Sequence, residues 1–388
     1  MRPLRIAVLG PYRYPLRQPA PGGLEGHVMD QVRLLRARGH EVLLVAPHGS
    51  EQLDPRYPEL AFTPLRWPVG ADRSDDRLPA GGLLRQEAVY ARAMRALAEI
   101  RPRVDVLHNH SLSGAPLRLA GRLGLPMITT LHTPVLPEML AGLHAARPRQ
   151  NRARQAFFSV SEHTRASWAR AGVTSRVLLN GVDTALWRPG PGGTGLVWSG
   201  RIVPEKAPHL AVAAARRAGL PLRLAGRIGA PRYFERVLRP ALGDGIEYVG
   251  ERSATELVEL VGGSRCALVT PGWEEPFGLV LPEALACGTP VAAFARGGLR
   301  ETGERTPAVR LVPADDVVAL ADAARDLGTD PSLRGIARRT AEQRFSVARR
   351  VDLLERCYAE LAGVTAGRWS DSRSMIDQLA SEVAEESA

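Results

Sequence analysis

Short apolar segments alternate with helical segments along nearly the whole chain, and this alternation constrains the fold more than any other feature. The chain begins with an apolar strand at residues 5–10, a Pro- and Gly-rich loop, a helix at 24–38 and a second apolar strand at 40–46. Units of this kind build parallel sheets with helices on both faces. Because the alternation resumes after residue 195 in a chain of 388 residues, we predict an α/β protein with two doubly wound domains.

The run WRPGPGGTG, at residues 187–195, is the most linker-like in the chain, and we place the domain boundary there. Residues 50–82 are rich in Pro, Asp and Arg and show little periodicity, so we expect a surface excursion. The predicted parts are an N-terminal domain at 1–186, a C-terminal domain at 187–345, a final helix within 346–363 and a polar tail at 364–388.

The formal net charge of +10 is weak evidence for a polyanionic partner. Lys206 is the only lysine among the 51 Lys and Arg side chains, and this skew is typical of a genome-wide coding preference. No RNP-like aromatic run, zinc spacing or basic repeat accompanies the charge, so nucleic-acid binding is disfavoured. A non-catalytic protein that binds nucleic acid or anionic lipid through a basic surface stays an alternative.

No apolar run approaches the ~20 residues that a membrane-spanning helix needs. The N-terminal run MRPLRIAVLG predicts a strand rather than a signal peptide, because its apolar part is short and no cleavage site follows. The three cysteines, Cys266, Cys287 and Cys357, lack CxxC spacing. We therefore expect a cytoplasmic protein with thiols in its core, and peripheral contact with the inner membrane face stays open.

The segment from Pro271 to Glu301 carries the most chemistry. It predicts a strand end, a loop, a short helix that Gly288 terminates, and another apolar strand at 291–294. Backbone amides at a helix N-terminus lack internal partners and carry partial positive charge, and a glycine there lets a phosphate approach closely. The amides expected to form this anion site belong to Phe277, Gly278, Leu279 and Val280.

Two carboxylates bracket the predicted anion site, Glu275 in the loop and Glu283 in the helix. Eight residues of continuous helical rise would separate them by ~12 Å. That spacing suits one carboxylate on a sugar and the other on a ribose, with a diphosphate between them.

The strand expected at 196–199 ends in Gly200 and Arg201, and Lys206 follows shortly after. If the bound anion is the leaving group of a nucleotide sugar, its charge must be held by a metal or by fixed cations. The chain has no Asp-x-Asp spacing for a metal, whereas Arg201 offers a planar fork and Lys206 a point charge. We therefore predict that both bind phosphate and that no metal is needed.

Other residues at expected strand or helix ends are candidates for ligand contacts. Gly22 and Gly23 begin a helix and are a second place where backbone can meet a phosphate, although a plain flexible turn is an alternative. His108, His110 and His132 lie near strand ends, but their spacing does not support zinc. We expect His132 to contact a sugar, while His108 and His110 are equally compatible with a structural role.

These motifs occur in an order that resembles the family 4 glycosyltransferases of GT-B fold, from about residue 5 to residue 361. Each motif alone is weak, and the segment with Glu275 and Glu283 is the most specific. The matching runs are GGLE at 22–25, RGHEV at 38–42, TLHT at 130–133, NGVD at 180–183, GR at 200–201 with PEK at 204–206, EPFG at 275–278, EA at 283–284 and GTPV at 288–291.

The resemblance implies two Rossmann-like domains facing across a cleft, with a final helix that crosses back to the N-terminal domain. By the matching motifs, Arg201 and Lys206 would hold the diphosphate together with the amides of Gly23, Leu279 and Val280. Glu283 would bind the ribose, and Glu275 and His132 the hexose-type sugar. Transfer would retain the anomeric configuration, with no cofactor beyond the nucleoside-diphosphate-sugar, and the leaving phosphate would help to deprotonate the acceptor.

Alternatives remain at the level of the reaction and of the acceptor. A nucleotide-sugar epimerase or a phosphorylase would use the same fold, although a phosphorylase would need a lysine for pyridoxal phosphate, and the sole lysine is already assigned. The loops at 11–23, 50–82 and 133–155 are expected to contact the acceptor, and their sequences leave natural-product, polysaccharide and lipid-linked acceptors open. An arginine cluster is compatible with lipid but more typical of a solvated face: Arg147, Arg149, Arg152 and Arg154. Neither the nucleobase nor an oligomeric state is predicted.

Overall fold

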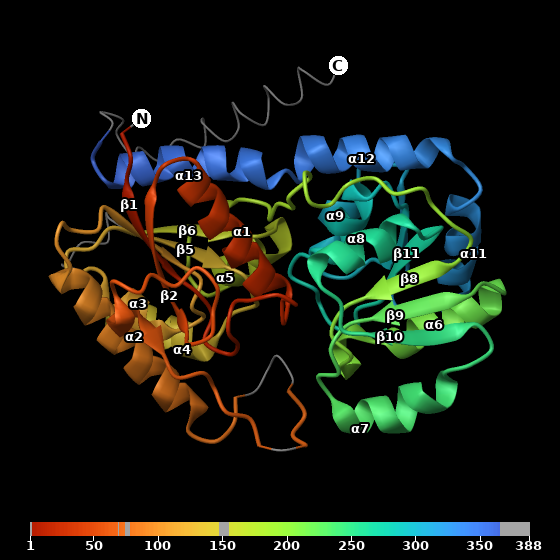
Figure 1. Cartoon of the computed structure of the whole chain (residues 1–388), viewed down its shortest axis with the longest axis horizontal. Helices are drawn as coiled ribbons and strands as arrows, with labels where there is room; N and C mark the ends of the chain where they lie inside the picture. Colours follow the sequence, from red (N-terminus) through yellow and green to blue (C-terminus); the bar gives the residue numbers. More distant parts are fainter. Residues whose placement is uncertain (1, 69, 74–77, 147–154, 365–388) are drawn as a thin grey trace.

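The structure, a computed structural model, describes residues 2–68, 70–73, 78–146 and 155–364. Within these residues the chain forms two parallel sheets that lie side by side, each packed between helices (Figure 1). This is the doubly wound α/β architecture that the alternation predicts. The arginine cluster at 147–154 and all but the first residue of the predicted tail lie outside the described residues.

The N-terminal sheet has the strand order β3-β2-β1-β4-β5-β6-β7, and every neighbouring pair is parallel. Its strands are β1 (Arg5–Leu9), β2 (Glu41–Pro47), β3 (Ala61–Phe62), β4 (Val106–Asn109), β5 (Met127–Leu131), β6 (Gln155–Ser159) and β7 (Arg176–Val177). Its helices are α1 (Gly23–Ala37), the short 3-10 helix η1 (Pro58–Leu60), α2 (Gly82–Glu99), α3 (Gly114–Leu119), α4 (Pro137–Ala145) and α5 (Glu162–Arg170).

The C-terminal sheet has the order β10-β9-β8-β11-β12-β13 and is also entirely parallel. Its strands are β8 (Leu196–Ser199), β9 (Leu222–Ala225), β10 (Ile246–Gly250), β11 (Cys266–Val269), β12 (Val291–Phe294) and β13 (Val309–Val312). Its helical segments are η3 (Pro204–Lys206), α6 (Pro208–Ala218), α7 (Pro231–Tyr233), η4 (Phe234–Leu238), η5 (Arg239–Ala241), α8 (Ala254–Gly262), α9 (Val280–Ala286), α10 (Leu299–Gly303), α11 (Val317–Leu327) and α12 (Ser332–Arg344).

Both faces of each sheet are buried, which explains why the strands are almost continuously apolar. In β1, Ile6 and Val8 belong to the core on one face, whereas Ala7 and Leu9 belong to the core on the other. Strand residues alternate between faces, so a strand covered on both sides needs apolar residues at every position. The free thiols of Cys266, Cys287 and Cys357 are buried in these cores. None of the helices that the structure describes is long and apolar enough to cross a membrane.

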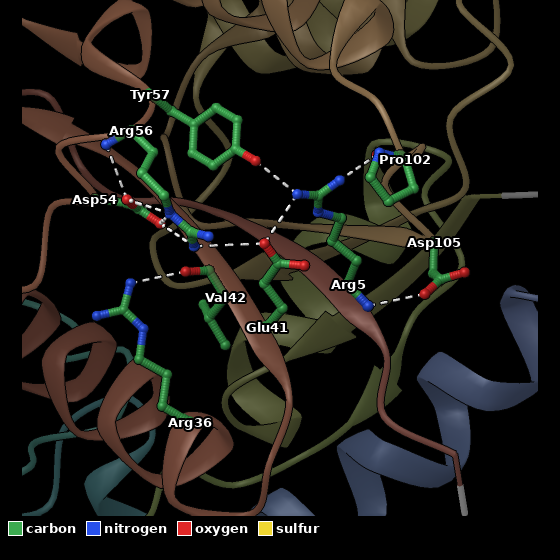
Figure 2. A network of polar contacts seen from close by, with 9 residues as sticks. All are labelled: Arg5, Arg36, Glu41, Val42, Asp54, Arg56, Tyr57, Pro102 and Asp105. Carbon is green, nitrogen blue, oxygen red and sulfur yellow. Dashed lines mark hydrogen bonds and ion pairs between the residues drawn. The ribbon is translucent and has the colours of Figure 1, made fainter.

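A polar network ties together the amino ends of the N-terminal strands (Figure 2). Arg5 and Glu41 are register partners at the starts of β1 and β2. The Arg5 guanidinium donates to Glu41 at 2.8 Å and to the Tyr57 hydroxyl at 2.6 Å. The Arg5 amide donates to Asp105 at 2.8 Å. Positive and negative side chains thus pair with one another at the amino ends of the strands. The cleft described below lies at the opposite, carboxyl ends.

The last helix, α13 (Val347–Leu361), packs on the N-terminal half and lies beside α1 (Figure 1). Its buried residues Val351, Leu354 and Tyr358 share one core with Ile6 and Val8 of β1. The predicted domain limits themselves stay predictions.

The chain crosses between the two halves at two places, and the two crossing segments are hydrogen-bonded to each other. The Val182 amide donates to the Phe345 carbonyl at 2.7 Å, and the Val347 amide donates to the Val182 carbonyl at 3.0 Å. A Cβ on Gly181 would lie only 2.5 Å from the Cα of Val347. The glycine therefore permits the close approach of the two segments.

Two expectations about local structure are wrong. The predicted excursion at 50–82 contains buried structure, because Ala61 and Phe62 form the edge strand β3 and pair with the end of β2. A strand of two residues is too short to show a period-2 pattern. The sequence also predicts a strand at residues 104–107 with His108 just beyond its end, whereas β4 runs from Val106 to Asn109 and places His108 inside the sheet.

We predict that Leu354→Ala lowers the free energy of unfolding by about 3 kcal/mol, because a buried leucine in a close-packed core leaves a cavity when truncated. The matched control is Arg356→Ala on the exposed side of α13, which should change stability by less than about 0.5 kcal/mol. Chemical denaturation measures both. Equal effects of the two substitutions would show that α13 does not depend on its apolar face for docking.

Candidate active site

A cavity of about 1430 Å³ lies between the two halves. The loops after β1, β4 and β5 line it from the N-terminal half, and the loops after β8, β9 and β11 line it from the other half. In both sheets the strand order reverses direction at this cleft, between β1 and β4 and between β8 and β11. Ligands of doubly wound proteins bind at such switch points, outside the carboxyl ends of the strands.

The cavity brings together the residues that the sequence singles out. Every one of the predicted site residues lines it: Gly22, Gly23, His132, Arg201, Lys206, Glu275, Phe277, Gly278, Leu279, Val280 and Glu283. By contrast, His108 and His110 are fully buried behind the cavity wall.

Lys206 and Glu275 form an ion pair on the C-terminal wall, with Nζ 2.5 Å from Oε2. The indole of Trp273 donates to the same carboxylate oxygen at 2.9 Å, and its ring lies 5.4 Å from the Lys206 Nζ. The pair is only partly exposed, so each charge holds the other in place in the absence of ligand. The two residues are therefore adjacent and can act on neighbouring groups of one substrate.

The loop that carries Glu275 is held by the backbone that follows β12. The amide of Gly297 donates to the Glu274 carboxylate at 2.7 Å, and the amide of Gly298 donates to the Glu275 carbonyl at 2.7 Å. A Cβ on Gly298 would lie 2.2 Å from the Pro276 carbonyl oxygen, so the two loops can pack this closely only with glycine there. This pair of glycines holds the backbone of the loop that carries Glu275.

The amino ends of α1 and α9 meet at the cavity. A Cβ on Gly23 would lie 3.0 Å from Leu279 Cδ1, and one on Gly22 would lie 4.0 Å from the Arg201 Nε. The amides of the first turn of α1 thus open toward the same space as those around Val280, beside the Arg201 side chain. This arrangement concentrates partial positive charge where an anion can bind.

The expected helical path from Glu275 to Glu283 is wrong. The helix α9 begins at Val280, with Leu279 as its N-cap, so the residues before it follow a turn instead. Gly278 takes a left-handed conformation with φ +79°, which breaks the helical path. The separation inferred from continuous helical rise therefore does not apply.

Two carboxyl groups that line the cavity from opposite halves, Glu283 and Asp30, influence each other electrostatically. Burial, and then the negative charge of Asp30 on α1, raise the pKa of Glu283 to about 8. Burial also raises the pKa of Asp30 to about 6, although neighbouring Arg33 opposes that shift. Arg33 itself forms an ion pair of 2.5 Å with Asp183 in the crossing segment. A ligand that donates hydrogen bonds to Glu283 therefore meets a carboxyl group that is largely protonated at neutral pH.

His132 is a neutral hydrogen-bonding group. Burial and the positive charge of Arg350 lower the pKa of His132 to about 3. Its Nε2 lies 2.7 Å from the Nδ1 of His110, and its ring centroid lies 5.8 Å from that of His27 on α1. A ring with such a pKa stays uncharged at neutral pH, so it suits sugar hydroxyls better than phosphate.

A chain of buried polar groups continues from His132 toward α13. The rings of His110 and His108 pack with centroids 4.0 Å apart, and the His108 Nδ1 lies 2.5 Å from the Tyr358 hydroxyl. The other His108 nitrogen lies 2.8 Å from the Thr130 hydroxyl. His108 and His110 thus support His132 from behind the cavity wall. Among the described residues no group of His, Cys, Asp or Glu is arranged to hold a metal ion.

Two family comparisons decide the identity of the fold and of the enzyme. Residues 21–186 match the family described as Glycosyltransferase Family 4, and residues 193–344 match Glycosyl transferases group 1. This chain is a family 4 glycosyltransferase of GT-B fold. The enzyme uses a nucleotide-sugar donor, and the alternatives of an epimerase, a phosphorylase and a basic non-enzyme protein no longer stand.

Relatives span nearly the whole glycosyltransferase. A glycogen synthase of Mycobacterium tuberculosis is 28% identical over 367 residues, covering 84% of this chain and 87% of the relative. A D-inositol 3-phosphate glycosyltransferase of Saccharomonospora viridis is 29% identical over 424 residues, covering 94% and 96%.

Two solved structures share the fold. Anabaena HepE in complex with UDP and glucose superposes with a TM-score of 0.68 at 19% identity, covering 92% of this chain and 99% of HepE. A glycosyltransferase involved in avilamycin A biosynthesis superposes with a TM-score of 0.63 at 23% identity, covering 94% and 99%.

Several cavity residues of this glycosyltransferase were missed by the sequence analysis. His27, Asp30 and Arg33 lie on one face of α1, and all three line the cavity. Their spacing of three residues was a usable signal, since it places polar side chains on a common face of a helix that otherwise buries apolar residues. Trp273 gave no comparable signal, because only the folded loop brings it against Glu275.

We predict that Gly278→Ala weakens binding of the donor nucleotide at least tenfold and lowers the melting temperature. The new Cβ would lie 2.5 Å from Leu299 Cδ2, at a backbone conformation that costs an L-residue about 1–2 kcal/mol. Gly219→Ala is the matched control, because Gly219 has a similar φ of +68° and no neighbour within 4 Å of its Cβ position. The control should lower stability without changing nucleotide affinity in calorimetric titrations. If Gly278→Ala bound the donor nucleotide with unchanged affinity, the turn before α9 would not be part of the donor site.

Proposed function

We propose that the enzyme transfers a hexose-type sugar from a nucleoside-diphosphate-sugar to an acceptor hydroxyl, with retention of configuration and without a metal ion. The observation that carries this proposal is that Arg201, Lys206 and the amino end of α9, from one half, meet the amino end of α1, from the other half, at the cavity. Fixed cations and backbone dipoles can stabilise a departing diphosphate in the way that a metal ion does elsewhere.

The remaining site residues take roles that follow from their positions. Glu283 accepts hydrogen bonds from the ribose hydroxyls, and Glu275 binds hydroxyls of the transferred sugar. Glu275 is already bonded to Lys206 and Trp273, which favours a positioning role over that of a nucleophile. His132 contacts the sugar from the N-terminal half. A leaving-phosphate oxygen then accepts the acceptor proton on the face from which the diphosphate departs.

The test of the donor class is a thermal-shift comparison of UDP, GDP, ADP and dTDP, because a ligand that binds only the folded state stabilises it by mass action. The structure of HepE with UDP and glucose makes UDP the first diphosphate to try. Release of the nucleoside diphosphate that depends on an acceptor, measured with and without a metal chelator, then tests transfer and metal independence. The anomeric configuration of the product, read by NMR, tests retention.

We predict that Lys206→Met lowers turnover by roughly 100-fold, an increase of about 3 kcal/mol in the barrier, because the departing diphosphate loses one fixed cation. The matched control is Arg217→Met, an exposed basic residue on α6 that should retain normal turnover. Steady-state kinetics with saturating donor separates a loss of kcat from a loss of affinity. Near-normal kcat in Lys206→Met would contradict the assignment of Lys206 to the leaving group.

We also predict that donor binding releases a proton from Glu283. Its pKa is about 8 in the free protein, and hydrogen bonds from a ribose favour the ionised form, so binding should lower that pKa. Affinity should therefore rise with pH toward about 8 and then level off.

The effect of pH on folding stability has the opposite sign. Because folding raises the pKa of Glu283, this group lowers the free energy of unfolding as pH rises from about 4.3 to about 8.

Calorimetric titration with the matching diphosphate at pH 7, in buffers of different ionisation enthalpy, counts the released protons. Glu283→Gln removes the contribution of this one group and leaves the ionisation of the ligand unchanged. If wild type and Glu283→Gln release the same number of protons, Glu283 does not bind the ribose as a carboxylate.

A further inference from the structure

Few large hydrophobic side chains are exposed in the part of the chain that the structure describes. They are Leu83 at 48%, Leu84 at 78%, Val237 at 40% and Val318 at 45%. Single exposed residues of this kind are ordinary. Leu83 and Leu84 differ from the two valines, because they are adjacent in the first turn of α2 and both line the cavity.

These two leucines belong to a larger apolar surface, which we call the leucine wall. It consists of cavity-lining residues from the segment before α2, the first turn of α2, the loop after β4 and the segment that leads into α4. Its members are Leu78, Leu83, Leu84, Leu112, Pro134, Leu136 and Pro137.

The segments of the leucine wall are held together as one surface. The side-chain amide of Gln86 on α2 donates to the carbonyls of Ser111 and Leu112 at 3.1 and 3.2 Å. Just after this loop, a Cβ on Gly114 would lie 2.2 Å from the Glu138 carbonyl oxygen, so α3 and α4 touch through their backbones. Figure 1 shows α2, α3 and α4 together on one side of the N-terminal sheet. The wall is therefore a built feature of the cavity.

The leucine wall adjoins the expected sugar contact. Pro134 follows His132 by two residues, and the loop that carries Leu112 begins at His110, which is hydrogen-bonded to His132 at 2.7 Å. Arg201, Lys206 and Glu283 come from the opposite half of the molecule. The wall thus borders the part of the cavity where an acceptor must approach a sugar held between His132 and Glu275.

The leucine wall favours an uncharged occupant over a strongly anionic one. Within the described cavity-lining residues of 78–84, 111–112 and 133–138, Glu138 is the only charged side chain. A phosphate or carboxylate group lying on these residues would meet a like charge there and would gain no cation from the leucine wall itself. A long glucan would likewise leave hydroxyl groups against leucine and proline side chains without hydrogen-bond partners.

We infer that the acceptor is an uncharged hydrophobic small molecule whose reacting hydroxyl lies near His132 and Glu275 and whose apolar body lies on the leucine wall. This inference rests on the proposed function, since it names the second substrate of the same site. Binding would remove Leu83 and Leu84 from water, and the gain would scale with the apolar area covered.

A homologous series of alcohols tests the inference. We would titrate the full-length enzyme, saturated with the matching nucleoside diphosphate, with hexan-1-ol, octan-1-ol and decan-1-ol below their solubility limits. Affinity should rise about two- to fourfold for each added methylene. In Leu83→Ser/Leu84→Ser the affinity for decan-1-ol should fall at least tenfold. Val318→Ser, an exposed hydrophobic residue on α11 that does not line the cavity, should bind like wild type.

The thermal shift with nucleoside diphosphate separates the inference from the proposed function. This shift should be the same in wild type, Leu83→Ser/Leu84→Ser and Val318→Ser, and it also shows that the variants fold. If wild type showed no shift with nucleoside diphosphate, the donor assignment would be overturned instead. A chain-length-independent affinity, or equal binding by the leucine and valine variants, would overturn the hydrophobic acceptor. A second set of outcomes would also overturn it. These are higher turnover with maltoheptaose, with inositol 1-phosphate or with a lipid in phosphatidylcholine vesicles than with octyl β-D-glucoside, provided that this turnover is unchanged in Leu83→Ser/Leu84→Ser.

Discussion

The structure depends on one geometric constraint: the carboxyl ends of two parallel sheets must face each other across a narrow gap. The chain crosses that gap twice, and the crossing segments pair through Val182, Phe345 and Val347. The helix α13 then returns to the N-terminal half, where Leu354 and Tyr358 join the core beneath β1. Because both crossings are anchored, residues separated by some 250 positions in the chain, such as Gly23 and Leu279, lie in contact at the cavity.

The electrostatics of the cleft follow from this closeness. Lys206 pairs with Glu275 within one half, whereas Arg33 of α1 pairs with Asp183 in the crossing segment. Asp30 and Glu283 approach each other from opposite halves, and burial and mutual repulsion keep the pKa of Glu283 near 8. Each of these charged groups interacts with another charged group of the protein, and a bound donor can take the place of that interaction. The cavity is thus prepared for a ligand that carries negative charge on one part and hydroxyl groups on the others.

Much of the site was predictable because its signals are local. A helix N-cap, a glycine after a strand or a Ser-x-x-Glu capping box depends on neighbouring residues, and the box formed by Ser253 and Glu256 at the start of α8 is an example. The helical path from Glu275 was wrong because Gly278 takes a left-handed turn, packed so closely against Leu299 that a Cβ would not fit, and a local pattern does not reveal that neighbour. His27 and Asp30 were overlooked for a similar reason, since their importance depends on what α1 faces.

The sequence by itself determined the two doubly wound units, the order of the family motifs, and the family, because apolar periodicity and strand-end residues are encoded within short windows. Only the tertiary structure decided which of those motifs share a cavity, how Trp273 and the Gly297–Gly298 turn hold the loop of Glu275, and that leucines from α2 line the same cavity. These relations arise where distant segments pack together. Distances and burial between such segments are properties of the fold as a whole, and no local window contains them.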